Sequence, residues 1–175
     1  MKLSLLTVCF ITLLSVSLHA AEQVEKRSAA DIIKTADKSQ WRTVSANNIL
    51  KLTLPTGAAY IELNEMLAPK HAENMKLLAR EGFYKGLNVY RFVEGFVAQG
   101  GDSSETKTPK TAKTALPAEF YYQTKKPLSI TQLQDPDGYA KRTGFLNGFA
   151  VAQNEAQTQT WQAHCPGIFA MARDN

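Results

Sequence analysis

The sequence predicts a mainly β fold, an antiparallel β-barrel that is closed or nearly closed, with one helix over an end. Residues 48–64 alternate apolar and polar side chains on both sides of a Pro-Thr-Gly turn, which is typical of a β-hairpin. From residue 69 the apolar residues recur at helical spacing, and residues 83–101 return to short strands interrupted by glycine. A hairpin, a helix and a second hairpin in this order favour such a barrel.

Composition excludes several classes of protein. The chain has 175 residues, which is enough for one domain and little for two. Its 44% hydrophobic and 21% charged content is typical of a globular protein. The net charge of +4 is small, and the lysines of residues 107–113 alternate with Thr and Ala. We therefore interpret residues 107–113 as a solvated loop and predict no nucleic-acid partner.

Residues 1–20 have the pattern of a secretory signal peptide. A lysine at position 2 is followed by an uncharged apolar run that is short for a membrane span and ends in small residues. The pattern predicts an exported protein, with the periplasm as its expected compartment and no membrane attachment after cleavage. Cleavage removes Cys9 and leaves Cys165 without a disulfide partner in the chain. We expect the Cys165 thiol to be buried.

Residues 21–47 are interpreted as a leader that precedes the main domain at 48–175. Ser28 followed by Asp31 is a weak helix-start signal, and Ile32 and Ile33 begin one short apolar face. This pattern predicts a helix over 28–38. The alternative interpretation is a leader that is partly disordered. In the main domain, Pro69 suits a first helical turn, and Gly82 is expected to end the helix. The apolar residues of that helix are Ala72, Met75, Leu78 and Ala79.

The order of residues from Ala68 to Asp102 resembles the cyclophilin-type peptidyl-prolyl cis/trans isomerases, in particular the exported bacterial type. A second segment, Pro166–Ala172, is similar to a later strand of that family. The matching positions of the first segment are Asn74, Phe83, Tyr84, Gly86, Arg91, Gly95, Phe96 and residues 99–102. A single Gln-Gly-Gly-Asp motif would be a weak signal, whereas this ordered set is specific.

The resemblance implies a role for six residues. Arg91 is implied as the catalytic residue, Phe96 as the floor of the pocket for the proline ring, and Val97 as a wall where the family usually has methionine. Gln99 is implied to hydrogen-bond the substrate backbone and to orient Arg91. Ala172 and Arg173 match positions whose backbone holds the residue before proline.

The chemistry of proline isomerisation explains why an arginine belongs in such a site. Rotation about an X-Pro bond breaks amide resonance, with a barrier of about 18–20 kcal/mol. A donor aimed at the proline nitrogen binds the twisted transition state better than either planar isomer, which is what catalysis requires. A guanidinium stays charged and offers several donors in one plane. This chemistry needs no cofactor and no metal, and neither His71 nor His164 has the spacing of a metal site.

Taken one at a time, the same residues have other interpretations. Arg91 could form a structural ion pair with Glu94 or Asp102. Phe96 and Val97 could be part of the barrel core, and Gln99 could tie a loop. The ordered match favours the functional interpretation.

Two features differ from the family pattern. Residues 121–162 are interpreted as an insertion. Its aromatic residues predict that the insertion packs against the domain: Tyr139, Phe145, Phe149 and Trp161. The chain stops at Asn175, where the family continues into further strands. About five barrel strands are therefore expected, so the barrel is predicted to be incomplete.

The function predicted from the sequence is a peptidyl-prolyl cis/trans isomerase that acts on proline-containing polypeptides and assists the folding of exported proteins. One alternative is a binding module with the same fold that holds proline-containing segments without catalysing rotation. A second alternative, a small-ligand carrier of the lipocalin kind, would need a regular up-and-down meander. The helix from Pro69 and the glycine-rich second hairpin argue against it.

Overall fold

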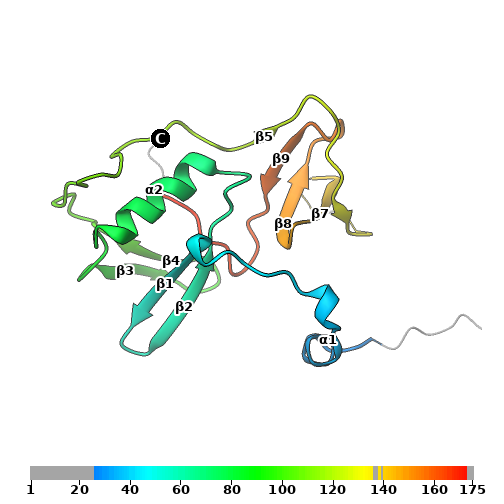
Figure 1. The fold of residues 1–175 in the computed structure, drawn as a ribbon, viewed down its shortest axis with the longest axis horizontal. Helices are drawn as coiled ribbons and strands as arrows, with labels where there is room; N and C mark the ends of the chain where they lie inside the picture. The colour runs from blue at the N-terminus through cyan, green and yellow to red at the C-terminus, as the bar shows by residue number, and fades with distance from the viewer. Residues whose placement is uncertain (1–25, 136–137, 139, 173–175) are drawn as a thin grey trace, which may run out of the picture. The chain divides into compact units, whose positions relative to one another are not determined.

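The structure, a computed structural model, describes residues 26–135, 138 and 140–172. The predicted signal peptide, Tyr139 and Arg173 lie outside these residues. The chain divides into two compact units, Met1–Arg42 and Thr43–Asn175, whose helices and strands are labelled in Figure 1.

The first unit contains helix α1 (Ala29–Thr35) and the 3-10 turn η1 (Lys38–Gln40). Helix α1 begins after Ser28, whose hydroxyl oxygen accepts a hydrogen bond of 3.1 Å from the Asp31 N–H. Ser28 and Asp31 therefore form the helix start that the sequence predicts. The helix ends at Thr35, earlier than expected, and Ile32 and Ile33 are exposed.

The second unit begins with the 3-10 turn η2 (Ala46–Asn48) and the hairpin of strands β1 (Ile49–Leu54) and β2 (Gly57–Glu62). The strands are antiparallel, with Ile49 opposite Glu62 and Leu54 opposite Gly57. The hairpin predicted from the alternating pattern is confirmed.

Helix α2 (Pro69–Arg80) has the start and end that the sequence predicts. Pro69 lies in the first turn, where the helix has no partner for the N–H that proline lacks. The helix ends before Gly82, which has a φ of +72°. Glycine adopts this left-handed conformation without the steric cost that a Cβ would bring.

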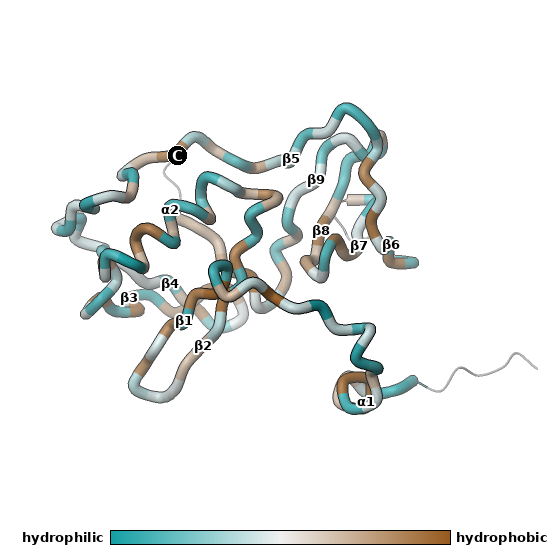
Figure 2. The backbone as a smooth tube through the Cα atoms, viewed as in Figure 1, coloured by the Kyte–Doolittle hydropathy of each residue, from teal (hydrophilic) through white to brown (hydrophobic). Residues whose placement is uncertain are grey.

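One face of α2 builds a hydrophobic core. Ala72, Met75 and Leu78 are buried together with Leu63, which follows β2. Figure 2 shows the corresponding hydrophobic stretches of α2 and β1. The partly buried residues packed against this core are Leu50, Phe83, Tyr84 and Ala112.

The helical face differs from the predicted one at three positions. Ala79 is exposed, whereas Asn74 and Lys76 are buried. The hydrophobic pattern does not predict the burial of these two polar residues, because each is buried together with a hydrogen-bonding partner. The Lys76 ammonium pairs with the Glu65 carboxylate, whose other oxygen accepts a hydrogen bond of 2.6 Å from the Asn48 side chain.

The segment Asp102–Glu119, called the strap below, binds α2 at both ends and near its middle. At the N-terminal end, the Glu119 carboxylate accepts hydrogen bonds from the backbone N–H groups of Lys70 (3.1 Å) and His71 (3.0 Å). The same carboxylate lies 2.8 Å from His71 Nδ1. A carboxylate at this place satisfies N–H groups that have no partner within the helix and complements the helix dipole.

Two further contacts hold the strap along the helix. Near the middle, the Asn74 side chain accepts from the Lys113 N–H (2.7 Å) and donates to the Lys113 carbonyl (3.0 Å). At the C-terminal end, the Glu81 carboxylate accepts from the N–H groups of Lys110 and Thr111 and from the Thr111 hydroxyl. The strap is thus held along α2 by hydrogen bonds that the sequence pattern does not predict.

Acidification is expected to weaken the attachment at Glu119. Burial raises the pKa of this carboxyl, but hydrogen bonds from the His71 side chain and from the His71 and Lys70 N–H groups outweigh it, so the pKa lies below its ordinary 4.5. A lowered pKa in the folded state gives stability that is fully present above 4.5 and is lost as the pH falls through the folded value. Urea unfolding measured at neutral pH and at several values below 4.5 should show this loss.

The matched control for this prediction is Glu119→Gln, which keeps one acceptor oxygen but does not titrate. The free energy of unfolding should fall more steeply with acid in the unmodified protein than in Glu119→Gln. Parallel pH profiles for the two proteins would show that the Glu119 contact contributes nothing to the acid dependence.

The strands of the second unit form three separate sheets among the described residues, β1–β2, β3–β4 and a five-stranded sheet in the order β5-β9-β8-β7-β6. These sheets do not close into a barrel, as expected for an incomplete one. The remaining strands are β3 (Asn88–Val93), β4 (Val97–Gly101), β5 (Tyr122–Gln123), β6 (Thr131–Gln132), β7 (Arg142–Leu146), β8 (Phe149–Gln153) and β9 (Gln159–Gln162).

The five-stranded sheet lies within the residues interpreted as an insertion. Its buried residues include Val151, Gln153 and Thr160, and the Gln153 side chain donates to Thr160 Oγ1 at 3.1 Å. The predicted packing of the aromatic residues is wrong for Phe145, which is 44% exposed. Trp161 is half-buried and makes an edge contact with Tyr121, with 5.8 Å between ring centroids.

Candidate functional site

The β3–β4 hairpin carries four of the six predicted site residues. Strands β3 and β4 are antiparallel, and Arg91 lies directly opposite Gln99. The register shifts between Val89 and Arg91, where the strand is irregular. The hairpin turn contains Gly95 with a φ of +70°, a conformation that favours glycine. This turn places Phe96 next to the end of β3.

The Arg91 side chain contacts two of the other predicted residues. Arg91 Nη1 donates a hydrogen bond to Gln99 Oε1 at 3.3 Å. The guanidinium carbon lies 5.7 Å from the centroid of the Phe96 ring, within the range of a cation–π interaction. The structure therefore brings Arg91, Phe96 and Gln99 together on one hairpin. Their arrangement leaves further guanidinium donors for another acceptor, because arginine offers five N–H groups.

The structural ion pair considered for Arg91 is absent. Among the residues that the structure describes, neither Glu94 nor Asp102 forms an ion pair with the guanidinium. Asp102 instead accepts hydrogen bonds from the Thr106 hydroxyl (3.2 Å) and the Lys107 N–H (2.6 Å), at the start of the strap. The charge of Arg91 needs no such partner, because the side chain is exposed to water.

The core interpretation of Phe96 is also wrong. Its side chain is 75% exposed, and Val97 beside it is half-buried. The β3–β4 hairpin forms a two-stranded sheet, and no third described strand pairs with it. Phe96 therefore has an open ring face in this structure rather than an enclosed pocket.

The predicted strand at Pro166–Ala172 is not present. The segment makes a turn, with an N–H of Ile168 bonded to the Cys165 carbonyl at 3.2 Å, and then continues without strand pairing to the exposed Ala172. A strand needs a partner for its backbone groups, and no described strand supplies one. The expectation of a buried Cys165 thiol is wrong as well, because this residue is exposed at the same turn.

Sequence reasoning missed the role of Lys107. Residues 107–113 form no helix or strand and Lys107 is exposed, as predicted for a solvated loop. In addition, the Lys107 ammonium donates to the carbonyls of Phe83 (2.7 Å) and Lys85 (2.8 Å). It thereby ties the connection between α2 and β3 to the strap. No local sequence pattern predicts this contact, because the carbonyls that Lys107 binds lie 22 and 24 residues away in the chain.

The described residues lack two further features. They contain no group of three or more His, Cys, Asp or Glu side chains arranged to hold a metal ion. In the same residues, no helix has the length and apolar character needed to cross a bilayer.

Residues 49–175 match the family model described as cyclophilin type peptidyl-prolyl cis-trans isomerase/CLD. The chain belongs to this family. The match includes the whole β3–β4 hairpin, α2, the strap and the five-stranded sheet. The cyclophilin-type assignment made from the motif at residues 68–102 is confirmed.

Individual relatives match shorter parts of the chain. A "Probable peptidyl-prolyl cis-trans isomerase" of Brucella suis biovar 1 is 46% identical over 55 residues, which are 31% of this chain and 28% of the relative. A "Peptidyl-prolyl cis-trans isomerase" of Helicobacter pylori strain J99 is 41% identical over 64 residues, 37% of this chain and 35% of the relative. The chain thus matches about a third of the length of each.

A solved structure supports the fold. The cyclophilin AquaCyp293 from Hirschia baltica is similar with a TM-score of 0.61 and 31% sequence identity. The similarity covers 77% of this chain and 55% of that cyclophilin. The mainly β, cyclophilin-like fold predicted from the sequence is therefore confirmed.

Proposed function

We propose that the protein is a peptidyl-prolyl cis/trans isomerase that acts on proline-containing polypeptides, with Arg91 as its catalytic residue. The observation that carries the proposal is the hydrogen bond from Arg91 to Gln99, with the guanidinium over the Phe96 ring. Membership of the cyclophilin-type family supports the same activity.

The catalytic step is rotation about the X-Pro bond. The planar amide resists rotation with a barrier of about 18–20 kcal/mol, because rotation breaks its resonance. In the twisted transition state the proline nitrogen regains a lone pair that the planar states lack. A guanidinium N–H of Arg91 donates to this nitrogen and so stabilises the transition state more than either isomer. No covalent bond is made or broken.

The neighbouring residues bind the substrate. Phe96 and Val97 provide an apolar surface for the proline ring, and the loss of exposed apolar area favours its binding. Gln99 holds one Arg91 nitrogen in place, which limits the rotamers of the long side chain before substrate binds. The backbone of Ala172 and Arg173 is assigned to hold the residue before proline, on the basis of the motif match.

The proposed place of action is outside the cytoplasm, in the periplasm. The motif of residues 1–20, a lysine followed by an uncharged apolar run and small residues, supports export. Clients would then be newly exported polypeptides whose folding waits for slow X-Pro isomerisation.

Catalysed isomerisation of an Ala-Pro-type peptide is the expected result that tests this proposal. Uncatalysed exchange takes about tens to hundreds of seconds at 25 °C, so NMR exchange spectroscopy or a protease-coupled assay resolves the acceleration. Peptide binding without acceleration would support a proline-binding module instead. If the peptide neither binds nor isomerises faster, both functions are contradicted.

A further inference from the structure

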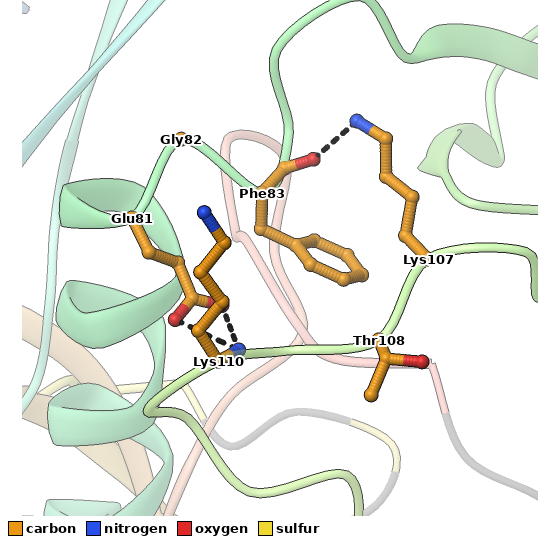
Figure 3. Close-up of a pocket in the computed structure, with 6 residues that line it drawn as sticks. All are labelled: Glu81, Gly82, Phe83, Lys107, Thr108 and Lys110. Carbon is orange, nitrogen blue, oxygen red and sulfur yellow. Dashed lines mark hydrogen bonds between the residues drawn. The ribbon is translucent and has the colours of Figure 1, made fainter.

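A hollow in the surface lies at the C-terminal end of α2, where the chain leads toward β3. It is a pocket of about 270 Å³ lined by Glu81, Gly82, Phe83, Lys107, Thr108 and Lys110. Figure 3 shows the Phe83 ring between the side chains of Lys107 and Lys110. The pocket is formed by the connection from α2 to β3 on one side and by the strap on the other.

Two of the charged groups in this pocket hold its walls. The Lys107 ammonium donates to the carbonyls of Phe83 and Lys85 and lies 5.8 Å from the Phe83 ring centroid. The Glu81 carboxylate accepts hydrogen bonds from the Lys110 and Thr111 backbone and from the Thr111 hydroxyl. Both walls are therefore fixed before any ligand arrives, which lowers the entropy cost of binding.

The Lys110 ammonium is different, because it forms no hydrogen bond or ion pair with any other residue that the structure describes. The Lys107 ammonium has a third donor beyond the two bound carbonyls. The hydrogen bonds to the Glu81 carboxylate reduce its repulsion of an anion, and two ammonium groups outnumber this one carboxylate. Together with the Phe83 ring, these groups suit a carboxylate carried on a short apolar stem.

We infer that this pocket binds an acidic side chain of the polypeptide substrate, with Lys110 as the residue that recognises the carboxylate. The choice of a peptide ligand rests on the proposed isomerase function. The pocket would then favour substrates that carry Asp or Glu at a set distance from the isomerised proline.

The place of the pocket in the chain supports a set distance between the acidic residue and the proline. Phe83 lies shortly before Asn88, the first residue of β3, and Lys107 lies shortly after Gly101, the last residue of β4. Asn88 and Gly101 face each other at the end of the hairpin. Arg91 is three residues further along β3, about 10 Å from Asn88 at about 3.3 Å per residue. The pocket residues follow this end of the hairpin in both directions along the chain, so the acidic residue is expected several residues away from the proline.

The test uses a series of Ala-rich peptides with one proline and one Glu, moved stepwise away from the proline on either side. Each peptide is paired with the same peptide carrying Gln. Dissociation constants come from NMR titration of the labelled protein, and isomerisation rates come from exchange spectroscopy on the same samples. At one or two spacings we expect the Glu peptide to bind about threefold more tightly than the Gln peptide, as exposed ion pairs allow. Its resonance shifts should include Thr108 and Lys110.

The variant Lys110→Gln should remove this preference, whereas Lys51→Gln, which neutralises an exposed lysine on β1, should keep it. Equal affinity for Glu and Gln peptides at every spacing would overturn the inference, even with normal isomerisation. A Glu preference that survives Lys110→Gln would overturn it as well. A Glu preference that depends on Lys110, observed without any accelerated exchange, would support the pocket and contradict the isomerase function.

Discussion

Replacing Arg91 by alanine is expected to remove most of the isomerase activity and to leave the fold intact. The donor that stabilises the twisted proline nitrogen is lost, and comparable single donors in other enzymes contribute about 10²–10³ in rate. The fold should survive because Arg91 is exposed, and its side chain makes a hydrogen bond to Gln99 and a cation–π contact with Phe96 but no ion pair among the described residues. Exchange spectroscopy on an Ala-Pro-type peptide measures the rate, and thermal unfolding of the same samples measures stability.

The conservative variant Arg91→Lys separates charge from geometry. Lysine keeps the positive charge but lacks the planar set of donors, so we expect it to recover only part of the lost rate. Peptide affinity should change less than the rate in both variants, since the apolar surface of Phe96 and Val97 remains. If Arg91→Ala lowers the melting temperature and the activity in parallel, or leaves the rate unchanged, Arg91 is not the catalytic residue.

The local elements of the fold could be predicted because their signals are short-range. The β1–β2 hairpin follows from strict alternation around a turn, and α2 follows from a proline at its start and a glycine after its end. The predicted strand at residues 166–172 failed for the opposite reason. Strand formation depends on a pairing partner elsewhere in the chain, and a seven-residue pattern carries no information about that partner.

The candidate site likewise has a part that the sequence predicts and a part that it does not. Arg91, Phe96 and Gln99 could be predicted to act together, since a single tight hairpin brings positions 91 and 99 opposite each other. The exposure of Phe96 could not, because it depends on which strands cover the hairpin. The pocket around Lys110 was also missed, because it joins the end of α2 to the strap through contacts about 30 residues apart in the chain.

The Asn74→Ala variant is expected to lower the free energy of unfolding by about 1–3 kcal/mol, the usual cost of losing buried hydrogen bonds. Asn74 is 9% exposed, and its side chain makes two hydrogen bonds to the backbone of Lys113. Alanine offers neither the acceptor nor the donor that these two hydrogen bonds use. The loss should therefore detach the middle of the strap from α2. Urea unfolding followed by circular dichroism measures the change.

Glu73→Ala is the matched control for this variant, since Glu73 is the neighbouring residue of α2 and is exposed. It removes a polar side chain from the same helical turn without touching the strap, so it should change stability by only about 0.5 kcal/mol or less. Hydrogen exchange adds a local reading, because the Lys113 amide donates to the Asn74 side chain and should exchange faster in Asn74→Ala alone. Equal stability losses in the two variants, with unchanged exchange at Lys113, would mean that the strap does not depend on Asn74 for its attachment to α2.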